Sequence, residues 1–187
     1  GRALVALEPT ADEIARHAPA LAEAYNDPRN APLLGHAEQL DAGDVVDHYA
    51  ELAAEGARQF HLFVDGALAG DADLRGLEGG EAEFAFLIAA PAAQGQGLGT
   101  RFAIMLHALG FAPPPLGAGL ETIHASVVPA NRASLRVFAK LGYHQDDTPA
   151  GRAYADEPGD VVLSIGRATF AALHAEALAA IVVEARG

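Results

Sequence analysis

The sequence predicts an α/β (α+β) protein in which a mixed sheet packs against helices in one domain, residues 1–187. Segments with apolar residues at helical spacing alternate with strand-like segments, in the order β-α-α-β-β-β-α-β-α-(β)-β-α. A length of 187 residues suits one domain that buries its own core without disulfides or metals. Because 51% of the residues are apolar, a disordered chain is excluded.

The N-terminal third predicts a strand followed by two helices. A loosely alternating segment over 2–8 predicts the strand. Thr10 and Glu13 have the spacing of a capping box, and apolar residues at helical spacing follow them. Two prolines within 26–35 predict a loop, and a second apolar helical face predicts a helix over 44–55.

The rest of the chain predicts strands interrupted by helices. Asp65 and Gly66 form a hairpin signal, and residues 75–80 predict a loop before a more apolar strand that stops before Pro91. Gly142 predicts the end of a short helix. Strands are expected over 59–64, 68–74, 81–89, 121–128 and 160–165. Helices are expected over 97–109, 131–141 and 169–185, the last forming an additional C-terminal helix within 168–187.

The composition excludes several classes of function. With 25 acidic and 12 basic residues, the formal net charge is −13, which argues against a nucleic-acid partner because phosphate binding needs surplus Lys and Arg. The absence of cysteine excludes disulfide frameworks, Cys–zinc and iron–sulfur sites, and thiol catalysis. Eight histidines show no metal-ligand spacing, so no metal site is expected. Lacking long apolar segments and a signal-peptide pattern, the chain is expected to be cytoplasmic, with no membrane partner.

The charge is distributed unevenly along the chain. Residues 94–140 carry four basic residues and one acidic residue within a strongly acidic protein. The basic residues are Arg101, Arg132, Arg136 and Lys140. Such a segment indicates either a local anion site or chance clustering.

A glycine-rich turn joins a buried strand to an amphipathic helix within this segment. The turn reads Gln94-Gly95-Gln96-Gly97-Leu98-Gly99-Thr100. Glycines allow backbone N–H groups to approach a ligand, and the helix N-terminus adds positive potential, so the turn predicts an anion cradle. The glycine spacing fails the dinucleotide fingerprint, and the absence of Gly-Lys-Ser/Thr excludes a P-loop. A plain strand-to-helix turn is the alternative.

A second motif follows one helix and one strand later. Residues 127–143 read as a strand end, Asn131-x-x-Ser134, a short helix, and Lys140-Leu-Gly-Tyr143. Together with Gln-x-x-Gly-x-Gly, this block resembles the GNAT superfamily of N-acetyltransferases. The two motifs and the elements between them cover about 81–143. Within this block, the sequence Pro-Ala-Asn-Arg-Ala-Ser is most similar to the ribosomal-protein N-terminal acetyltransferase-like branch of the superfamily.

The resemblance implies a mostly antiparallel sheet that is splayed between its fourth and fifth strands, with helices on both faces. It also implies that acetyl-CoA is the cosubstrate. The pantetheine arm would pair with the backbone of Leu87, Ile88 and Ala89. The pyrophosphate would lie on the N–H groups of Gln94, Gly95, Gln96, Gly97, Leu98, Gly99 and Thr100. Further cofactor contacts would come from Asn131, Arg132, Ser134, Phe138 and Lys140, with Arg101 and Arg136 as additional candidates for the 3′-phosphate.

The resemblance also implies direct attack of a primary amine on the thioester in a ternary complex. Glu83 matches the general base, with Glu81 as a competitor and a surface role as the alternative. Backbone N–H groups near Leu87 and Ile88 would stabilise the oxyanion. Phe138 stands where many relatives place a tyrosine acid, which leaves Ser134, then Tyr143, as substitutes. Unassisted departure of the thiolate is a further possibility.

The acceptor is expected to be a cationic amine, either a peptide N-terminus, a polyamine or an aminoglycoside. His124 and Ser126 share one face of a strand and either line the acceptor groove or serve structural roles. Acidic residues lie in the segments that would face the acceptor: Glu38, Asp41, Asp44, Asp47, Asp146, Asp147, Asp156 and Glu157. Solubility alone also explains this acidity. The C-terminal helix either covers the sheet or forms a homodimer contact.

Two other functions remain open from the sequence alone. The first is a CoA-binding regulatory protein or catalytically weak pseudo-acetyltransferase, because Phe138 has no proton to give. The second is a binder of a nucleotide other than CoA. Release of CoA with an amine would indicate an active acetyltransferase, whereas acetyl-CoA binding without turnover would indicate the first alternative. Binding of AMP as tight as that of CoA would indicate the second.

Overall fold

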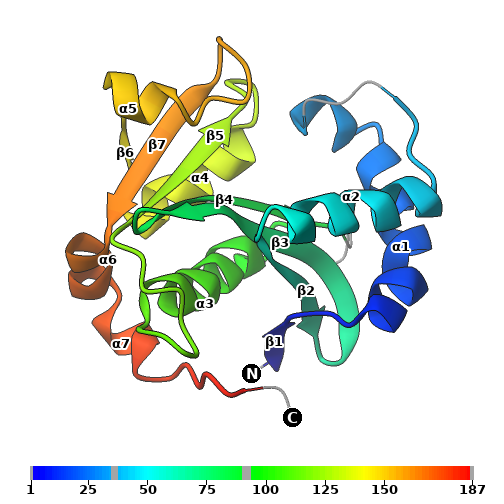
Figure 1. The fold of residues 1–187 in the computed structure, drawn as a ribbon, viewed down its shortest axis with the longest axis horizontal. Helices are drawn as coiled ribbons and strands as arrows, with labels where there is room; N and C mark the ends of the chain where they lie inside the picture. The colour runs from blue at the N-terminus through cyan, green and yellow to red at the C-terminus, as the bar shows by residue number, and fades with distance from the viewer. Residues whose placement is uncertain (1, 35–37, 90–93, 186–187) are drawn as a thin grey trace.

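A computed structural model describes residues 2–34, 38–89 and 94–185 of the chain, and its strands form one seven-stranded sheet (Figure 1). The order in the sheet is β1-β2-β3-β4-β5-β7-β6. The strands are β1 (Leu4–Leu7), β2 (Arg58–Val64), β3 (Ala67–Glu78), β4 (Glu81–Ile88), β5 (Thr122–Val127), β6 (His144–Gln145) and β7 (Val161–Gly166). The sheet is antiparallel except between β4 and β5, which confirms the predicted fold class.

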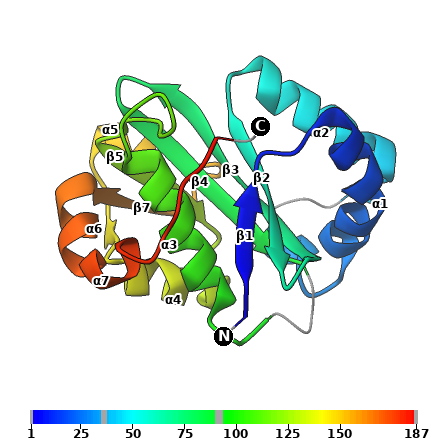
Figure 2. The same cartoon turned by 90° about the horizontal axis from the view of Figure 1, so that it is seen from below.

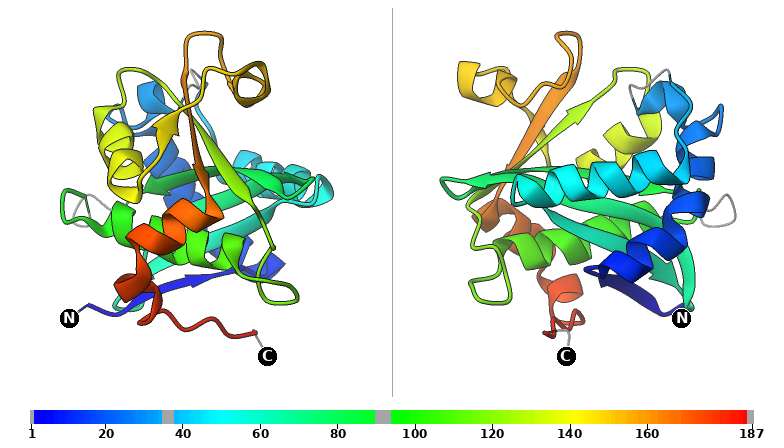
Figure 3. Two further views of the ribbon diagram at one scale, coloured as in Figure 1. Left: turned by 90° about the vertical axis from the view of Figure 1, so that its left-hand side faces the viewer. Right: turned by 45° about the vertical axis from the view of Figure 1, so that its right-hand side comes forward.

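Helices cover both faces of this sheet. They are α1 (Ala11–Asn26), the short 3₁₀ helix η1 (Ala31–Leu33), α2 (Ala42–Ala54), α3 (Leu98–Phe111), α4 (Arg132–Leu141), α5 (Pro149–Arg152), α6 (Arg167–Leu173) and α7 (Ala175–Leu178). The two sides of the sheet are seen in Figure 3, with α3 below it and α2 above it in the right-hand view. Within the described ranges, no helix is long and apolar enough to cross a membrane.

The parallel pairing of β4 with β5 is short. It joins Glu81 to Thr122, Ala82 to Ile123 and Glu83 to His124, and no further pair forms. Beyond Glu83, β4 continues to Ile88 beside β3 alone, while β5 continues to Val127 beside β7. The splay that the resemblance implied is therefore present, and it leaves one edge of β4 open.

The main core lies between the sheet and α3. It contains Phe102 and Leu106 of α3, Phe84 of β4 and Ile123 of β5, each no more than 2% exposed. A smaller cluster joins α1 to α2 on the opposite face. Burial of these apolar side chains is the main favourable contribution to folding.

Capping interactions set where the first two helices begin. The predicted capping box is present at α1, where the Glu13 N–H donates to Thr10 Oγ1 and the Thr10 N–H donates to Glu13 Oε2. The second helix begins at Ala42, two residues before the predicted start. Asp41 is its N-cap, and Asp44 completes a second capping box. Two carboxylates that were predicted for the acceptor side therefore cap a helix.

The predicted helix over 169–185 is wrong. Helix α6 ends at Leu173 and α7 spans only four residues, with His174 between them in a non-helical conformation. A ring nitrogen of His174 bonds to the carbonyl oxygen of Leu141 at 2.9 Å, which ties the break to the end of α4. Figure 2 shows the residues after α7 running on as an extended tail across α3.

The C-terminal segment has one deeply buried apolar anchor. Phe170 of α6 is 1% exposed and packs on Phe111, whereas Leu173 and Val182 are exposed. Only some of the apolar side chains of this segment are therefore packed against the rest of the protein. A helix without a continuous apolar face gains little from tertiary packing, and alanine propensity alone does not hold short helices together.

Two other boundaries differ from the prediction. The expected loop over 75–80 is a tight turn, because β3 extends to Glu78 and β4 starts at Glu81. The strand that was predicted to reach Ala89 ends at Ile88. Pro91, where the prediction placed its end, lies outside the described residues.

A buried carboxylate ties α1 and α2 to the sheet. Asp71 of β3 is 6% exposed and accepts hydrogen bonds from the hydroxyl groups of Tyr25 and Tyr49, the latter at 2.9 Å. Burial raises the pKa of Asp71 to about 6, against the opposing effect of the two tyrosine hydrogen bonds. The folded state therefore holds this proton at a pH where the unfolded chain has released it.

Asp71 is expected to make stability fall as the pH rises. Below about pH 4 the carboxyl is protonated in both states, and between about pH 4 and 6 only the folded state keeps the proton. Relative to Asp71→Asn, which has no titrating group there, the wild-type free energy of unfolding should fall by about 2–3 kcal/mol across this window. Urea denaturation of both proteins at several pH values measures the difference. Parallel stability curves would contradict the assignment.

Candidate active site

A groove of about 510 Å³ lies at the end of β4, on the open edge that the splay leaves. Its walls come from the end of β4, the glycine turn with the first residues of α3, the exposed side of α4, and the segment between α1 and α2 that includes η1. Both sequence motifs therefore meet in one concave site.

Most of the predicted cofactor residues line this groove. They are Leu87, Ile88, Gln94, Gly95, Gly97, Leu98, Gly99, Thr100, Asn131, Ser134 and Lys140. Four others are absent from the described lining: Ala89, Gln96, Arg132 and Phe138. The Ala89 N–H donates to the carbonyl of Ala69 at 2.7 Å, so its backbone is committed to β3.

The glycines of the turn have two separate physical roles. Gly95 and Gly97 have φ values of 72° and 74°, a conformation that side chains disfavour. Gly97 is the N-cap of α3 and provides no side-chain cap, which leaves the first N–H groups of the helix for another partner. At Gly99, a Cβ atom would lie 3.2 Å from the Phe86 ring, so glycine permits α3 to pack closely on β4.

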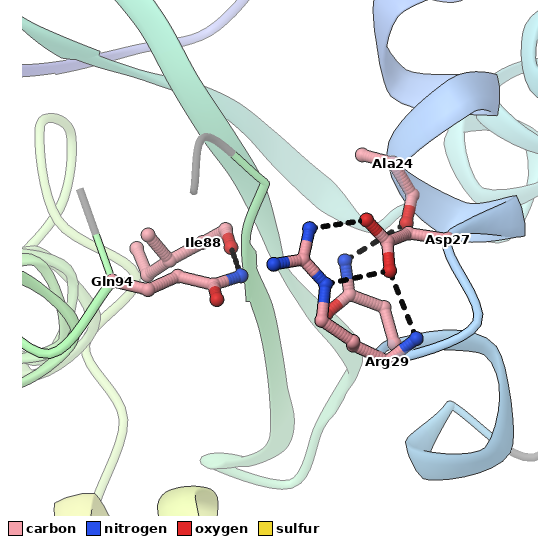
Figure 4. Close-up of polar contacts among 6 residues, drawn as sticks. Ala24, Asp27, Arg29, Ile88 and Gln94 are labelled. Carbon is pink, nitrogen blue, oxygen red and sulfur yellow. Dashed lines mark hydrogen bonds and ion pairs between the residues drawn. The ribbon is translucent and has the colours of Figure 1, made fainter. Parts of the chain in front are cut away.

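Gln94 holds the turn against the strand. Its Nε2 donates to the carbonyl oxygen of Ile88 at 2.9 Å, as Figure 4 shows. At the opposite wall, Asn131 caps α4 by accepting the Ser134 N–H at 3.1 Å. Both residues therefore shape the groove through hydrogen bonds within the chain.

Three basic side chains face the groove. Arg136 and Lys140 come from successive turns of α4, and Arg29 comes from the segment after α1. Arg101 and Arg132 are absent from the described lining. Arg29 lies outside both motifs, in a segment that the sequence marked only as a proline-containing loop, so no sequence signal singled it out.

Glu83 lies where β4 and β5 part. Its side chain is 12% exposed, and Arg75 Nε lies 4.0 Å from its Oε2. Burial raises the pKa of Glu83 to about 7, while Arg75 lowers it and the charges of Asp156 and Asp73 raise it. A carboxyl group with this pKa exchanges its proton near neutral pH, as a general base must.

Glu81, the competing carboxylate, has a different environment. Its side chain is 45% exposed, and its Oε2 accepts a hydrogen bond from the Tyr154 hydroxyl at 3.0 Å. His124 Nε2 lies 3.5 Å from the same oxygen. Glu81 therefore serves a surface hydrogen-bond cluster, whereas Glu83 lies deeper.

The segment before β7 covers the face of the sheet beside Glu83. His124 stacks on Tyr154 with ring centroids 3.9 Å apart and is 4% exposed. Ser126 donates to Asp160 Oδ2 at 2.9 Å and accepts from the Asp156 N–H at 3.0 Å. These two residues, which were predicted either to line the acceptor groove or to be structural, hold this covering segment in place.

The predicted acidic residues divide by position. Asp156 acts electrostatically on Glu83, and Asp73 of β3 adds a second negative charge that the sequence did not single out. Asp146 is bonded to Thr148, and Asp147 accepts hydrogen bonds from Gln145, so both belong to the β6–α5 turn. Among the described residues, no group of three or more His, Asp or Glu side chains is arranged to hold a metal ion.

Phe138 and Tyr143 lie in the core. Phe138 is 3% exposed and packs edge-on against Phe84 and Phe86. The His107 Nδ1 lies 2.7 Å from the carbonyl of Ala103 and therefore donates to it, so Nε2 accepts from the Tyr143 hydroxyl at 2.5 Å.

Neither aromatic residue belongs to the described lining of the groove. Burial raises the pKa of Tyr143 well above its usual value and lowers the pKa of His107 to about 3. Both groups are therefore neutral, and the Tyr143 hydroxyl is used inside the protein.

The parted sheet and the glycine turn after its fourth strand are the features that the resemblance to the GNAT superfamily implied. The sequence pattern of the acetyltransferase (GNAT) domain family matches residues 6–144 of the chain. The chain belongs to this family. No curated protein sequence matches the chain significantly.

Solved structures share the fold over most of the chain. RimJ of Mycobacterium smegmatis, in complex with CoA-disulfide, superposes with a TM-score of 0.74 at 17% identity and covers 95% of this chain and 88% of its own. The aminoglycoside acetyltransferase AAC(6')-Ib with coenzyme A gives 0.71 at 21% identity, covering 90% and 97%. Its complex with coenzyme A and kanamycin gives 0.70 at 20% identity, covering 90% and 97%.

Tyr143→Phe is expected to destabilise the fold. The change leaves the buried His107 Nε2 without its donor, which should lower the free energy of unfolding by about 1–3 kcal/mol. Tyr154→Phe is the matched control, because its hydroxyl bonds to a partly exposed carboxylate and should matter less. Chemical denaturation measures both variants, and equal effects would argue against the buried role of Tyr143.

Proposed function

We propose that the protein is an N-acetyltransferase that transfers an acetyl group from acetyl-CoA to a primary amine by direct attack in a ternary complex. The observation that carries the proposal is the groove. The open edge of β4, the start of α3 without a side-chain cap, and the basic side chains of α4 converge there. Related folds with bound CoA support the choice of cosubstrate.

The proposed binding mode assigns each part of CoA to one wall. The pantetheine arm would add to the free edge of β4 near Leu87 and Ile88, as an extended ligand adds to a strand. The pyrophosphate would accept hydrogen bonds from the first N–H groups of α3. Arg136 and Lys140 are the bases of α4 that are placed to meet the 3′-phosphate.

Glu83 is the proposed general base. An alkylamine is protonated at neutral pH, so a proton must leave before the nitrogen attacks the thioester carbonyl carbon. Glu83 takes that proton, directly or through water. The nitrogen then attacks the carbonyl carbon, and the new C–N bond gives a tetrahedral intermediate whose oxygen carries a negative charge. Backbone N–H groups on the open edge of β4 are the candidate donors to this oxyanion.

Collapse of the intermediate breaks the C–S bond and releases CoA as a thiolate. The positively charged nitrogen loses its second proton in this step, and the thiolate takes up that proton, directly or through a relay. Ser134 lines the groove and is the candidate acid, whereas Tyr143 is committed to His107 in the core. A thiol pKa of about 8.5 makes departure without a dedicated acid feasible. The phenylalanine at position 138 is therefore compatible with turnover.

A cationic acceptor fits the charge near Glu83. Asp73, Glu83 and Asp156 influence one another electrostatically, with Arg75 as the opposing charge. Such a surface attracts small polycationic amines or a basic peptide N-terminus. The bound kanamycin of AAC(6')-Ib favours including aminoglycosides in the panel.

A CoA-binding protein without turnover is the second candidate. Burial of Phe138, where many relatives carry a tyrosine, favours it. The decisive experiment is release of free thiol from acetyl-CoA with a panel of peptides, polyamines and aminoglycosides. Acceptor-dependent release establishes the acetyltransferase, and acetyl-CoA binding without release on the whole panel establishes the alternative.

Glu83→Gln should lower kcat/KM by about 10²–10⁴-fold, because the amine loses its proton acceptor. The affinity for CoA, measured by calorimetry, should stay unchanged. Glu81→Gln is the control and should retain activity within a few-fold. An unchanged rate in Glu83→Gln would remove Glu83 as the base.

The pH profile should report the charges around Glu83. Wild-type kcat/KM should fall as the pH drops below about 7, where the carboxyl gains its proton. Arg75→Gln should move this limb to higher pH, because the positive charge lowers the pKa of Glu83. Asp156→Asn should move it to lower pH. Shifts in the same direction would contradict the assignment.

A further inference from the structure

The segment between α1 and α2 forms a wall of the groove that neither sequence motif contains. Arg29, Asn30, Leu33 and Leu34 all line the groove from this side. They face the bases of α4 across the open edge of β4. Arg29 is the only one of the four with a charge, and the binding mode proposed above does not use it.

The Arg29 side chain is held by one edge of its guanidinium group. Its Nε donates to Asp27 Oδ1 at 2.9 Å, and its Nη2 donates to Asp27 Oδ2 at 2.6 Å. The Arg29 backbone N–H donates to Oδ1 as well, at 2.8 Å. A planar guanidinium that is fixed at two nitrogens has little freedom to rotate.

The remaining nitrogen, Nη1, points away from Asp27. Figure 4 shows this atom directed toward the side on which Gln94 and Ile88 lie. Gln94 begins the glycine turn, and Ile88 ends β4. The free edge of the guanidinium therefore faces the junction of strand and turn.

Asp27 itself is well placed to keep this orientation. The hydrogen bonds and charge of Arg29 lower the pKa of the Asp27 carboxyl to about 2, so it stays ionised at every working pH. The surrounding backbone is also tied to α1, because the Asn30 side chain donates to the carbonyl of Ala24 at 2.9 Å and the Asn30 N–H donates to Asp27.

The pairing with Asp27 has little value as a stability device. The Arg29 side chain is 63% exposed, and exposed ion pairs contribute little to folding. Its geometry instead suits recognition of an anion, since arginine offers parallel N–H donors to phosphate oxygens. The anion that belongs at the junction of β4 and the glycine turn is a phosphoryl group.

We propose that Arg29 binds the pyrophosphate of the CoA cosubstrate from the side opposite α4, and that Asp27 positions it. The inference rests on the proposed function. Arg29 would supply N–H donors from one side, while the start of α3 supplies backbone N–H donors from the other. A ligand in the groove would then touch the segment after α1 as well as both motifs.

Binding of three ligands to Arg29→Gln tests the contact. The ligands are CoA, dephospho-CoA, which lacks the 3′-phosphate, and pantetheine, which lacks all phosphates. The variant should lose about tenfold in affinity for CoA and for dephospho-CoA, and nothing for pantetheine. Arg167→Gln, which removes another exposed arginine paired with a carboxylate, is the control and should change none of the three.

The outcomes separate this inference from the proposed function. If wild-type protein fails to bind CoA, the proposed function fails. If wild-type protein binds CoA and Arg29→Gln binds it equally well, only the role of Arg29 is overturned. A loss confined to CoA, with dephospho-CoA unchanged, would place the contact on the 3′-phosphate and overturn the pyrophosphate assignment.

A double-mutant cycle tests the positioning role of Asp27. Asp27→Asn should weaken CoA binding by a smaller factor than Arg29→Gln, and should add nothing in the Arg29→Gln background. In steady-state kinetics, both variants should raise KM for acetyl-CoA with little change in kcat. Independent, multiplying effects in the cycle would show that Asp27 acts by another route.

Discussion

The parting of β4 from β5 after three residue pairs is the constraint on which the rest of the site depends. Paired strands would leave no room between them, and their backbone groups would satisfy one another. Once they part, the edge of β4 after Glu83 has no strand partner within the described part of the chain, and the Ile88 carbonyl at its end is bonded to Gln94 instead. Gly99 lets α3 pack closely on the end of β4, because a Cβ atom there would lie 3.2 Å from the Phe86 ring.

The opposite face of the same strands buries charge in a regular pattern. Asp71, Asp73 and Arg75 alternate along β3, and Glu83 pairs with Arg75 on β4, so a two-residue period places all four on one face. Burial raises the pKa of Asp71 and of Glu83 for the same reason. Two tyrosines satisfy Asp71, which makes it structural, whereas Glu83 lies among charges at the point where the strands separate.

The sequence contained the signals that depend on local backbone geometry. The capping box at Thr10 and the end of a short helix at Gly142 are short-range features that the sequence predicted, and both are present. The placement of the two motifs in one groove followed from the resemblance.

Features that depend on tertiary contacts were not predictable in the same way. At the break between α6 and α7, His174 forms a hydrogen bond to Leu141, which lies 33 residues away in the chain. Burial of Tyr143 depends on His107 of another helix. Arg29 gave no signal because its position in space, and not its neighbours in sequence, brings it to the groove.

The side-chain amide of Gln94 sets a limit on β4. Because it donates to the carbonyl of Ile88, the last backbone acceptor of the strand is already engaged from within the protein. In the proposed binding mode, an extended ligand along the open edge would therefore stop pairing at that residue and turn toward the start of α3. In that binding mode, Gln94 would set the length over which the ligand continues the sheet.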